Sequence, residues 1–359
     1  MTGTVRLGVL CAGLVVFAVG VGLGPRHHAA EGLGPGALTG YLLLAGGLVA
    51  ALWAAGRILG ATRRRWWAPV VALLLVATAL ALWTLGQAVA ASFPPRPALD
   101  GRTPADVGLV YSDVTFPSSD GTALAGWYVP SRNGAAVVLM HGAGSTRSAV
   151  LDHARVLADH GYGVLLFDAR GHGQSAGRGM DFGWFGESDA SGAVDFLAAR
   201  PDVESARIGL VGMSMGGEQA IGAAGADERV RAVVAEGATH RVAADKGYLD
   251  AYGVRGELQQ RVDRVTYGLA GLLTSAPEPV PLRRSVSVAT RRPDPAAFLL
   301  VTAGDVPNES LAADHVREGS TTGVTTWNVA GAGHTQGLAT APDAWEEHVV
   351  AFLDDALGR

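Results

Sequence analysis

The chain has 359 residues, a length that allows more than one domain. Hydrophobic residues make up 48% and charged residues only 17%, so the composition excludes a disordered chain and indicates that part of the sequence lies in lipid. The net charge of −5 provides no basic field for nucleic acid, and the single cysteine, Cys11, excludes an intramolecular disulfide.

Three apolar runs predict a membrane domain over residues 1–91. They cover about residues 7–24, 37–56 and 66–91, and they contain no aspartate, glutamate, lysine, arginine or histidine. A helix rises about 1.5 Å per residue, so about 20 residues cross a hydrocarbon core of about 30 Å. Trp53, Trp66 and Trp83 lie near the ends of the runs, where interfacial anchors are expected. We therefore predict three transmembrane helices with a lipid bilayer as their partner.

The first apolar run also fits a secretory signal peptide, because Arg6 precedes a short apolar stretch. The residues that follow it, 24–28, read Gly-Pro-Arg-His-His and offer no small-x-small cleavage site. We predict that this segment is retained as a membrane helix, with cleavage as the alternative.

The distribution of arginine between the apolar runs predicts their orientation. The link between the second and third runs is rich in positive charge and carries Arg57, Arg63, Arg64 and Arg65. The link between the first and second runs carries only Arg26, which Glu31 offsets. Positively charged links stay on the cytoplasmic side of a membrane. The N-terminus is therefore expected in the cytoplasm and everything after the third span outside it.

The remainder of the chain predicts a linker and one α/β domain. Residues 92–105 contain several prolines and are expected to form the linker. Strands are predicted at 114–117, 123–129, 135–140, 163–167, 208–211, 230–235, 297–302 and 325–329. Helices are predicted at 148–160, 190–199, from 214 onward and at 344–357. This alternation predicts a mostly parallel, doubly wound sheet over residues 106–359, with the first two strands forming a hairpin.

The first central strand ends in a glycine-rich loop, residues 141–145, which reads His-Gly-Ala-Gly-Ser. The flexible His-Gly pair lets the main chain bend toward a neighbouring strand end, and the N–H of Ala143 is then a candidate oxyanion donor. We interpret His141 as structural, because a serine, acid and histidine in that chain order need a histidine near the end of the sequence.

Residues 212–216, Gly-Met-Ser-Met-Gly, carry the strongest chemical signal. They follow a predicted strand and open a predicted helix, which is the context that a Gly-x-Ser-x-Gly nucleophile turn requires. The glycines allow the chain to turn sharply, and the turn presents the hydroxyl of Ser214 at the edge of the sheet. The N–H of Met215 lies at the helix start, where it can donate to an oxyanion.

The segment of about residues 239–295 is inserted between two predicted strands and is a candidate cap. It contains tyrosines and a leucine cluster at Leu269, Leu272 and Leu273. These residues line an apolar pocket or belong to helices packed on the sheet, and we favour the second interpretation. A cap would favour acyl substrates over bare peptides.

The last two strands supply the candidate base and acid. His334 lies in a glycine-rich loop, residues 331–335, and is placed to act first as general base and then as general acid. The preceding loop, residues 303–309, offers two carboxylates, Asp305 and Glu309. Asp305 is nearer to the strand end and Glu309 has the longer side chain, so both remain candidates for orienting His334.

Together these motifs resemble the α/β-hydrolase superfamily, in particular its serine-aminopeptidase-like and monoacylglycerol-lipase-like branch. The likeness covers about residues 110–357 and includes the loop 168–175, Asp-Ala-Arg-Gly-His-Gly-Gln-Ser, onto which no catalytic role is carried. The resemblance implies a mostly parallel sheet and a triad that needs no cofactor and no metal. It also implies Ser214 as nucleophile, His334 as base, and the Ala143 and Met215 amides as oxyanion donors.

The acid loop departs from the pattern of that superfamily. Members usually carry Gly-x-x-Asp there, whereas this register places Val306 or Pro307 in the slot of the aspartate. The choice between Asp305 and Glu309 therefore stays open at the level of sequence.

The sequence supports two functional hypotheses. The first is a membrane-anchored serine hydrolase that cleaves a small-molecule acyl ester, with amide, thioester and peptide substrates left open. The second is a catalytically silent binding or assembly module attached to the membrane. An excess of arginine over lysine and the abundance of alanine and glycine suggest a bacterial, GC-rich genome. The sequence does not indicate an oligomeric state.

Overall fold

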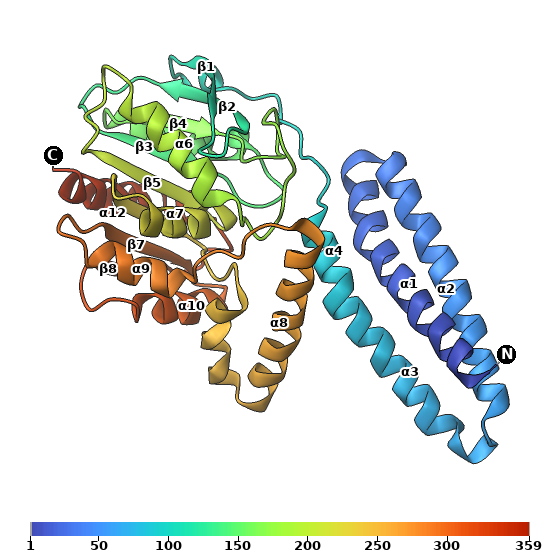
Figure 1. Cartoon of the computed structure of the whole chain (residues 1–359). Helices are drawn as coiled ribbons and strands as arrows, with labels where there is room; N and C mark the ends of the chain where they lie inside the picture. The colour runs from blue at the N-terminus through green and yellow to red at the C-terminus, as the bar shows by residue number, and fades with distance from the viewer. Residues whose placement is uncertain (1, 359) are drawn as a thin grey trace. The chain divides into compact units, whose positions relative to one another are not determined.

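The computed structural model describes residues 2–358 and contains two compact units (Figure 1). The helical unit comprises residues 2–95 together with Val254–Ser275. The sheet unit comprises Arg96–Gly253 together with residues 276–358. The middle of the insertion between two strands thus belongs to the same unit as the N-terminal apolar helices, which differs from the expectation that the whole insertion packs on the sheet.

The helical unit is built from three long N-terminal helical segments and one helix from the insertion. Their bounds are α1 (Gly3–Glu31), α2 (Pro35–Ala61), η1 (Arg64–Trp66), α3 (Trp67–Ala81), the π-helical turn η2 (Leu82–Gly86), α4 (Gln87–Ser92) and α8 (Val254–Thr274). η1 to α4 follow one another as one helical run. Three segments, Gly3–Glu31, Pro35–Ala61 and Arg64–Ser92, are long and apolar enough to cross a membrane. Each extends beyond the apolar run that predicts it.

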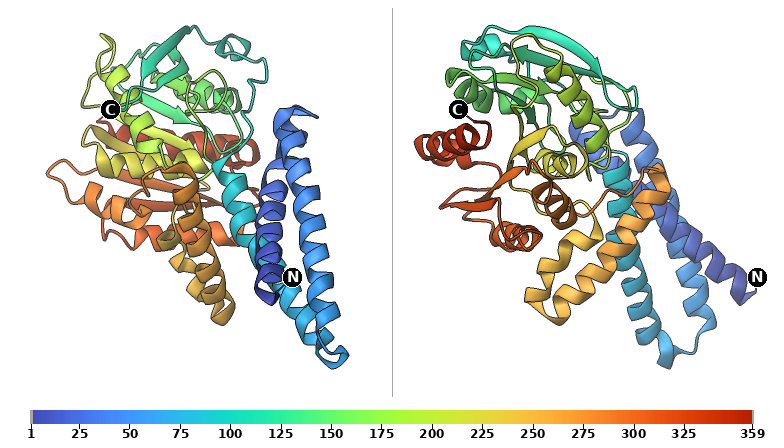
Figure 2. Two further views of the ribbon diagram at one scale, coloured as in Figure 1. Left: turned by 45° about the vertical axis from the view of Figure 1, so that its right-hand side comes forward. Right: turned by 60° about the vertical axis from the view of Figure 1, so that its left-hand side comes forward.

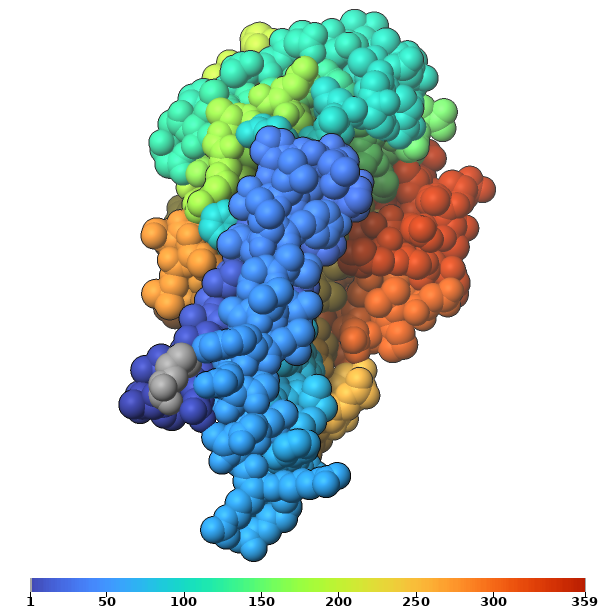
Figure 3. All heavy atoms as spheres, turned by 90° about the vertical axis from the view of Figure 1, so that its right-hand side faces the viewer, coloured from blue at the N-terminus to red at the C-terminus, as the bar shows by residue number. Residues whose placement is uncertain are grey.

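Glycine allows α1 and α2 to pack main chain against main chain. A Cβ atom at Gly20 would overlap the main chain of Leu44, and one at Gly47 would overlap the main chain of Phe17. The two helices lie side by side over much of their length (Figures 1 and 3). Such close approach through small residues is typical of helix pairs in membranes, where packing rather than the hydrophobic effect drives association.

The sheet unit contains one eight-stranded sheet. Its strands are β1 (Ser112–Pro117), β2 (Ala123–Val129), β3 (Ala136–Met140), β4 (Gly163–Phe167), β5 (Ile208–Met213), β6 (Val230–Glu236), β7 (Ala297–Ala303) and β8 (Val324–Val329). They are arranged in the order β1-β2-β4-β3-β5-β6-β7-β8. β2 runs antiparallel to β1 and β4, whereas β4, β3 and β5 to β8 pair in parallel. The prediction of a mostly parallel sheet with an N-terminal hairpin is confirmed.

Helices cover both faces of this sheet (Figure 2). α6 (Gly186–Ala198), α7 (Met215–Ala226), α9 (Leu282–Thr290) and α10 (Pro307–Arg317) pack on one face, and α5 (Leu151–Asp159) and α12 (Pro342–Ala356) pack on the other. The shorter helical segments are η3 (Pro104–Val107), η4 (Arg147–Val150), η5 (Ala243–Tyr252) and α11 (Gly337–Thr340). Successive residues of β3 alternate between the two cores: Val138 faces the first and Val137 the second. Burial on both faces explains why the central strands are continuously apolar.

The sequence pattern locates the strands to within a few residues and indicates a helix around His315, but it misses the first turn of α10. The segment after β7 reads as a loop because proline and polar residues open it. In the structure Pro307 occupies the first turn of α10, where a missing N–H costs nothing. The third residue of this helix is Glu309, so the missed first turn carries one of the two candidate acids.

Candidate active site

The turn between β5 and α7 holds Ser214 in a strained conformation. Its φ of 52° and ψ of −118° are rare for a residue with a side chain. Glycine is required on both sides: a Cβ atom at Gly212 would overlap the carbonyl of Gly216, and one at Gly216 would overlap the carbonyl of Met140. The close packing of β5, β3 and α7 thus fixes the turn, and the serine hydroxyl lies within reach of His334.

The structure brings Ser214, His334 and Glu309 together in one hydrogen-bonded chain. The Nε2 atom of His334 lies 2.9 Å from the Ser214 Oγ, and its Nδ1 atom lies 2.6 Å from the Glu309 Oε1. Because an ionised carboxylate only accepts hydrogen bonds, the Nδ1–H donates to Glu309 and Nε2 is left to accept the serine proton. The three side chains come from the ends of β5, β8 and β7, which meet at the same edge of the sheet.

The position of Glu309 separates the two candidate acids. Glu309 is buried at the start of α10, and its second oxygen, Oε2, accepts the Ala303 N–H at 2.8 Å. Asp305 is exposed, and its main-chain N–H donates to the Ala332 carbonyl. The structure therefore places Glu309, and not Asp305, against His334. The hydrogen bond to Glu309 raises the pKa of His334 above its ordinary value.

The two candidate oxyanion donors belong to segments that adjoin Ser214. A Cβ atom at Gly142 would lie 3.4 Å from the Cβ atom of Ser214, so the loop that carries Ala143 packs against the serine. Met215 is the first residue of α7. The N–H groups of a first helical turn have no intrahelical acceptor, so the Met215 amide is available to an anion beside the hydroxyl.

Comparison with known proteins gives a consistent picture for the sheet unit. Residues 131–282 match a family described as serine aminopeptidase, S33. An esterase of Pyrococcus furiosus, Pf2001, superimposes with a TM-score of 0.57 at 22% identity, covering 74% of this chain and 98% of the esterase. The α/β hydrolase GrgF of a Penicillium species has a TM-score of 0.53 at 21% identity, covering 70% of this chain and all of that protein. The sheet unit has the α/β-hydrolase fold, and we call it the α/β-hydrolase domain below.

Curated relatives match a shorter part of this α/β-hydrolase domain. The uncharacterised protein Rv2307c of Mycobacterium tuberculosis is 34% identical over 161 residues, which are 43% of this chain and 54% of the relative. The thiohydrolase aneE of Aspergillus aculeatus is 39% identical over 133 residues, which are 34% of this chain and 40% of the relative. The chain thus spans about half the length of the curated relatives it matches.

His141 supports the loop of the α/β-hydrolase domain that carries Ala143, residues 141–145. The buried ring accepts the Ala169 N–H at Nε2 and donates from Nδ1 to the Gly142 carbonyl, at 3.0 and 2.8 Å. Burial lowers the pKa of His141 to about 4, so the ring stays neutral and keeps both hydrogen bonds. Its place beneath the loop agrees with the structural role predicted for it.

A buried ion pair, which the sequence does not reveal, fixes the far end of the same loop. The Arg147 guanidinium pairs with the Asp168 carboxylate, and Asp168 Oδ1 also accepts the Arg147 N–H at 2.9 Å. The guanidinium lies over the ring of Trp127, 4.3 Å from its centroid. The motif that begins at Asp168 thus connects β4 to the segment following Ala143. Its signal in the sequence is the aspartate directly after an apolar strand.

Glu236 is a second residue that sequence reasoning misses. It ends β6, is buried, and accepts the Gly337 N–H at Oε1 and the Trp345 Nε1–H at Oε2, at 2.8 and 2.9 Å. Burial raises the pKa of this carboxyl. Gly337 follows the loop of His334, so the Glu236 side chain holds that loop in place. Its signal in the sequence is the carboxylate that directly follows the apolar run of residues 232–235.

Glu218 is a further buried carboxyl close to the site. It lies in the first turn of α7 and accepts the N–H groups of Thr239 and His240, at 3.1 and 2.9 Å. Burial raises the pKa of Glu218 to about 7. The negative charges of Glu218 and Glu236 add to that of Glu309 in raising the pKa of His334. The imidazole therefore sits among three carboxyl groups.

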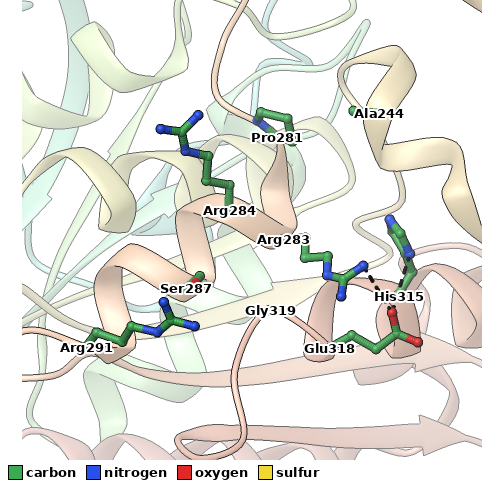
Figure 4. Close-up of a pocket in the computed structure, with 9 residues that line it drawn as sticks. All are labelled: Ala244, Pro281, Arg283, Arg284, Ser287, Arg291, His315, Glu318 and Gly319. Atoms are coloured by element: carbon green, nitrogen blue, oxygen red, sulfur yellow. Dashed lines mark ion pairs between the residues drawn. The ribbon is translucent and has the colours of Figure 1, made fainter.

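A separate hollow of about 410 Å³ lies on the surface of the α/β-hydrolase domain (Figure 4). It is lined mainly by polar side chains of α9 and α10, with Arg283, Arg284, Arg291, His315 and Glu318 among them. Figure 4 shows Arg283 and His315 directed toward Glu318, which pairs with them at 3.3 and 3.9 Å. The residues that line this hollow include none of the predicted site residues. Across residues 2–358, no group of three or more histidine, cysteine or acidic side chains is arranged to hold a metal ion.

Proposed function

We propose that this chain is a serine hydrolase anchored in a membrane, which cleaves a carboxylic ester through an acyl-enzyme. The observation that carries the proposal is the continuous chain of hydrogen bonds from the Ser214 hydroxyl through His334 to Glu309. A nucleophile, a base in contact with it, and a buried group that orients the base are the parts that acyl transfer needs. As a base, His334 needs a proton on Nδ1 and none on Nε2. The hydrogen bond from Nδ1–H to Glu309 favours this tautomer.

In the first half of the reaction, Ser214 Oγ attacks the acyl carbonyl carbon as its proton moves to His334 Nε2. The carbonyl oxygen becomes an oxyanion and accepts hydrogen bonds from the Met215 and Ala143 amides. Removing one such donor typically costs about 100-fold or more in turnover. The intermediate then collapses, the bond to the leaving alcohol breaks, and the imidazolium returns the proton to the alcohol oxygen.

In the second half, water takes the place of the alcohol. His334 accepts a proton from the water as its oxygen attacks the acyl carbon. The bond between the acyl group and Ser214 Oγ breaks, the serine regains its proton from the imidazolium, and the carboxylic acid leaves. Glu309 stabilises the imidazolium in both halves without itself being protonated.

An ester is the substrate class that the relatives favour. The Pyrococcus furiosus neighbour is an esterase and the Aspergillus aculeatus relative is a thiohydrolase, so both names refer to acyl groups on oxygen or sulfur. The matching family is described by an aminopeptidase, so an amide substrate is the second candidate. A panel containing p-nitrophenyl esters, acyl thioesters and aminoacyl amides separates these classes.

The proposal is tested with the purified full chain in detergent. We expect Ser214→Ala to abolish both turnover of p-nitrophenyl butyrate and labelling by a fluorophosphonate probe, while the thermal midpoint of the variant stays close to that of the unaltered protein. Labelling that persists in Ser214→Ala would reject this serine as the nucleophile. An unaltered protein that is inert to the whole panel and to the probe would favour a binding module.

Membrane anchoring through the N-terminal helices completes the proposal. The three apolar segments support it, and the four arginines of the link between the second and third favour a cytoplasmic position for that link. The N-terminus is then cytoplasmic and the α/β-hydrolase domain lies outside the cytoplasm. Protease added to intact cells should degrade the domain, whereas a domain degraded only after lysis would reverse the orientation.

A further inference from the structure

A stripe of exposed apolar side chains runs the length of α8. Val254, Leu258, Val265 and Leu272 are 82%, 57%, 52% and 81% exposed. Steps of four and seven residues keep side chains on one face of a helix with 3.6 residues per turn. A helix whose outer face met only water would carry mainly polar residues along this line, whereas Arg261 is the one charged residue that α8 places on it.

The exposed stripe is not the face that holds α8 in the helical unit. Val262, Thr266, Tyr267 and Ala270 are buried and lie on other sides of the helix. α8 packs against η2 and α4, which together form residues 82–92, the last part of the third candidate span. The helix therefore has its packing partners and still presents a second apolar surface.

We propose that this stripe, Val254, Leu258, Val265 and Leu272, is immersed in the lipid bilayer beside the end of the third span. The proposal rests on the membrane anchoring proposed above but not on the catalytic residues. Its basis is continuity: α8 contacts a helical run whose own outward side chains, among them Leu80 and Trp83, are exposed and apolar. An apolar surface adjoining a lipid-facing surface is covered by the same lipid.

Charges on and beside the stripe fit the headgroup level of a bilayer. Arg261 lies on the line of the stripe between Leu258 and Val265, and Arg255 and Arg264 are exposed to either side of it. Glu257 lies one turn before Arg261, with 3.9 Å between their charged groups. The remaining acidic residue of α8, Asp263, is buried. Guanidinium groups bind lipid phosphates well, and long arginine side chains extend from an apolar surface to reach them. The helix thus has the composition of an interfacial segment.

Site-directed spin labelling of the full chain in phospholipid nanodiscs tests this contact. In a Cys11→Ser background, which removes the native thiol, single cysteines are introduced as Leu258→Cys or Leu272→Cys. The matched control is Glu347→Cys, an exposed polar position of another helix, α12. Power saturation then compares each label's accessibility to oxygen, which concentrates in lipid, with its accessibility to a water-soluble nickel chelate.

We expect the labels at positions 258 and 272 to be accessible to oxygen and protected from the nickel chelate, and the label at 347 to show the opposite. Nickel accessibility at both stripe positions would overturn the proposal, because the stripe would then lie in water. Low accessibility to both reagents would also overturn it and would indicate a protein contact such as a second copy of the chain. Neither result depends on esterase activity, so the catalytic part of the proposed function stands or falls separately.

Discussion

Glu236 is hydrogen-bonded to Ser214 through its main-chain carbonyl, which accepts the serine N–H at 2.7 Å. Its carboxylate meanwhile accepts the Gly337 N–H beyond the loop of His334. One residue at the end of β6 therefore supports both Ser214 and the segment that follows the loop of His334. The distance between the Ser214 hydroxyl and the imidazole depends on this shared support.

We expect Glu236→Gln to lower turnover by about tenfold and to destabilise the domain by about 1–3 kcal/mol, because an amide nitrogen would then oppose a buried donor. Trp345→Phe removes the other hydrogen-bond partner of the carboxylate and is the comparison. Ester kinetics and thermal unfolding of both variants measure the effects. If the two variants lose stability equally and neither loses turnover, Glu236 has no positioning role.

The two candidate acids provide a matched pair of variants. Glu309→Gln keeps the size of the side chain but removes the charge beside His334, and we expect turnover to fall by at least about 100-fold. Asp305→Asn makes the corresponding change in the same loop, away from the imidazole, and should leave turnover within about twofold. Steady-state kinetics with p-nitrophenyl butyrate decide between them. The reverse ranking would show that the acid is Asp305.

The pH dependence of kcat/KM reports the protonation of His334. The base acts only when neutral, and Glu309 raises the pKa of the imidazole above its ordinary 6.5. The protonated form therefore persists to higher pH, so activity should rise as the pH increases through a value above 6.5. In Glu309→Gln the residual activity should still rise with pH, but this rise should occur at a lower pH than in the unaltered protein. If the rise of kcat/KM occurs at the same pH in Glu309→Gln and in the unaltered protein, Glu309 does not control the protonation of His334.

The packing of α1 on α2 is tested by neighbouring glycines. Gly47→Leu places a side chain into the main chain of α1, whereas a Cβ atom at Gly46 has no atom within 4 Å. We expect Gly47→Leu to separate the helices and lower the stability of the helical unit by about 1–3 kcal/mol. Gly46→Leu should have little effect. Helical circular dichroism during heating in detergent micelles measures both.

Much of the sheet unit can be predicted because its strands are buried on both faces. A run such as Val137-Val138-Leu139 admits few conformations outside a central strand, and each glycine-rich turn follows such a run. The serine at one turn and the histidine at another could therefore be assigned to the same sheet edge. This assignment follows because the carboxyl ends of neighbouring parallel strands lie at the same edge of a sheet.

Two features of the site depend on packing that no pattern in the sequence records. The choice of Glu309 over Asp305 follows from α10, whose first turn directs the longer side chain back under His334. The role of Glu236 follows from Gly337 and Trp345, both about 100 residues away in the chain. Long-range hydrogen bonds of buried carboxylates depend on the complete fold, so local propensity does not predict them.

The polypeptide passes between the two compact units three times, after Pro95, after Gly253 and after Ser275. One cut in the proline-containing stretch before the sheet would therefore not separate the two units, because α8 is joined to the sheet unit by the two further crossings. Complete covalent separation of the sheet unit requires cuts at all three places. Limited proteolysis of the purified chain thus tests how the polypeptide connects the units, independently of its chemistry.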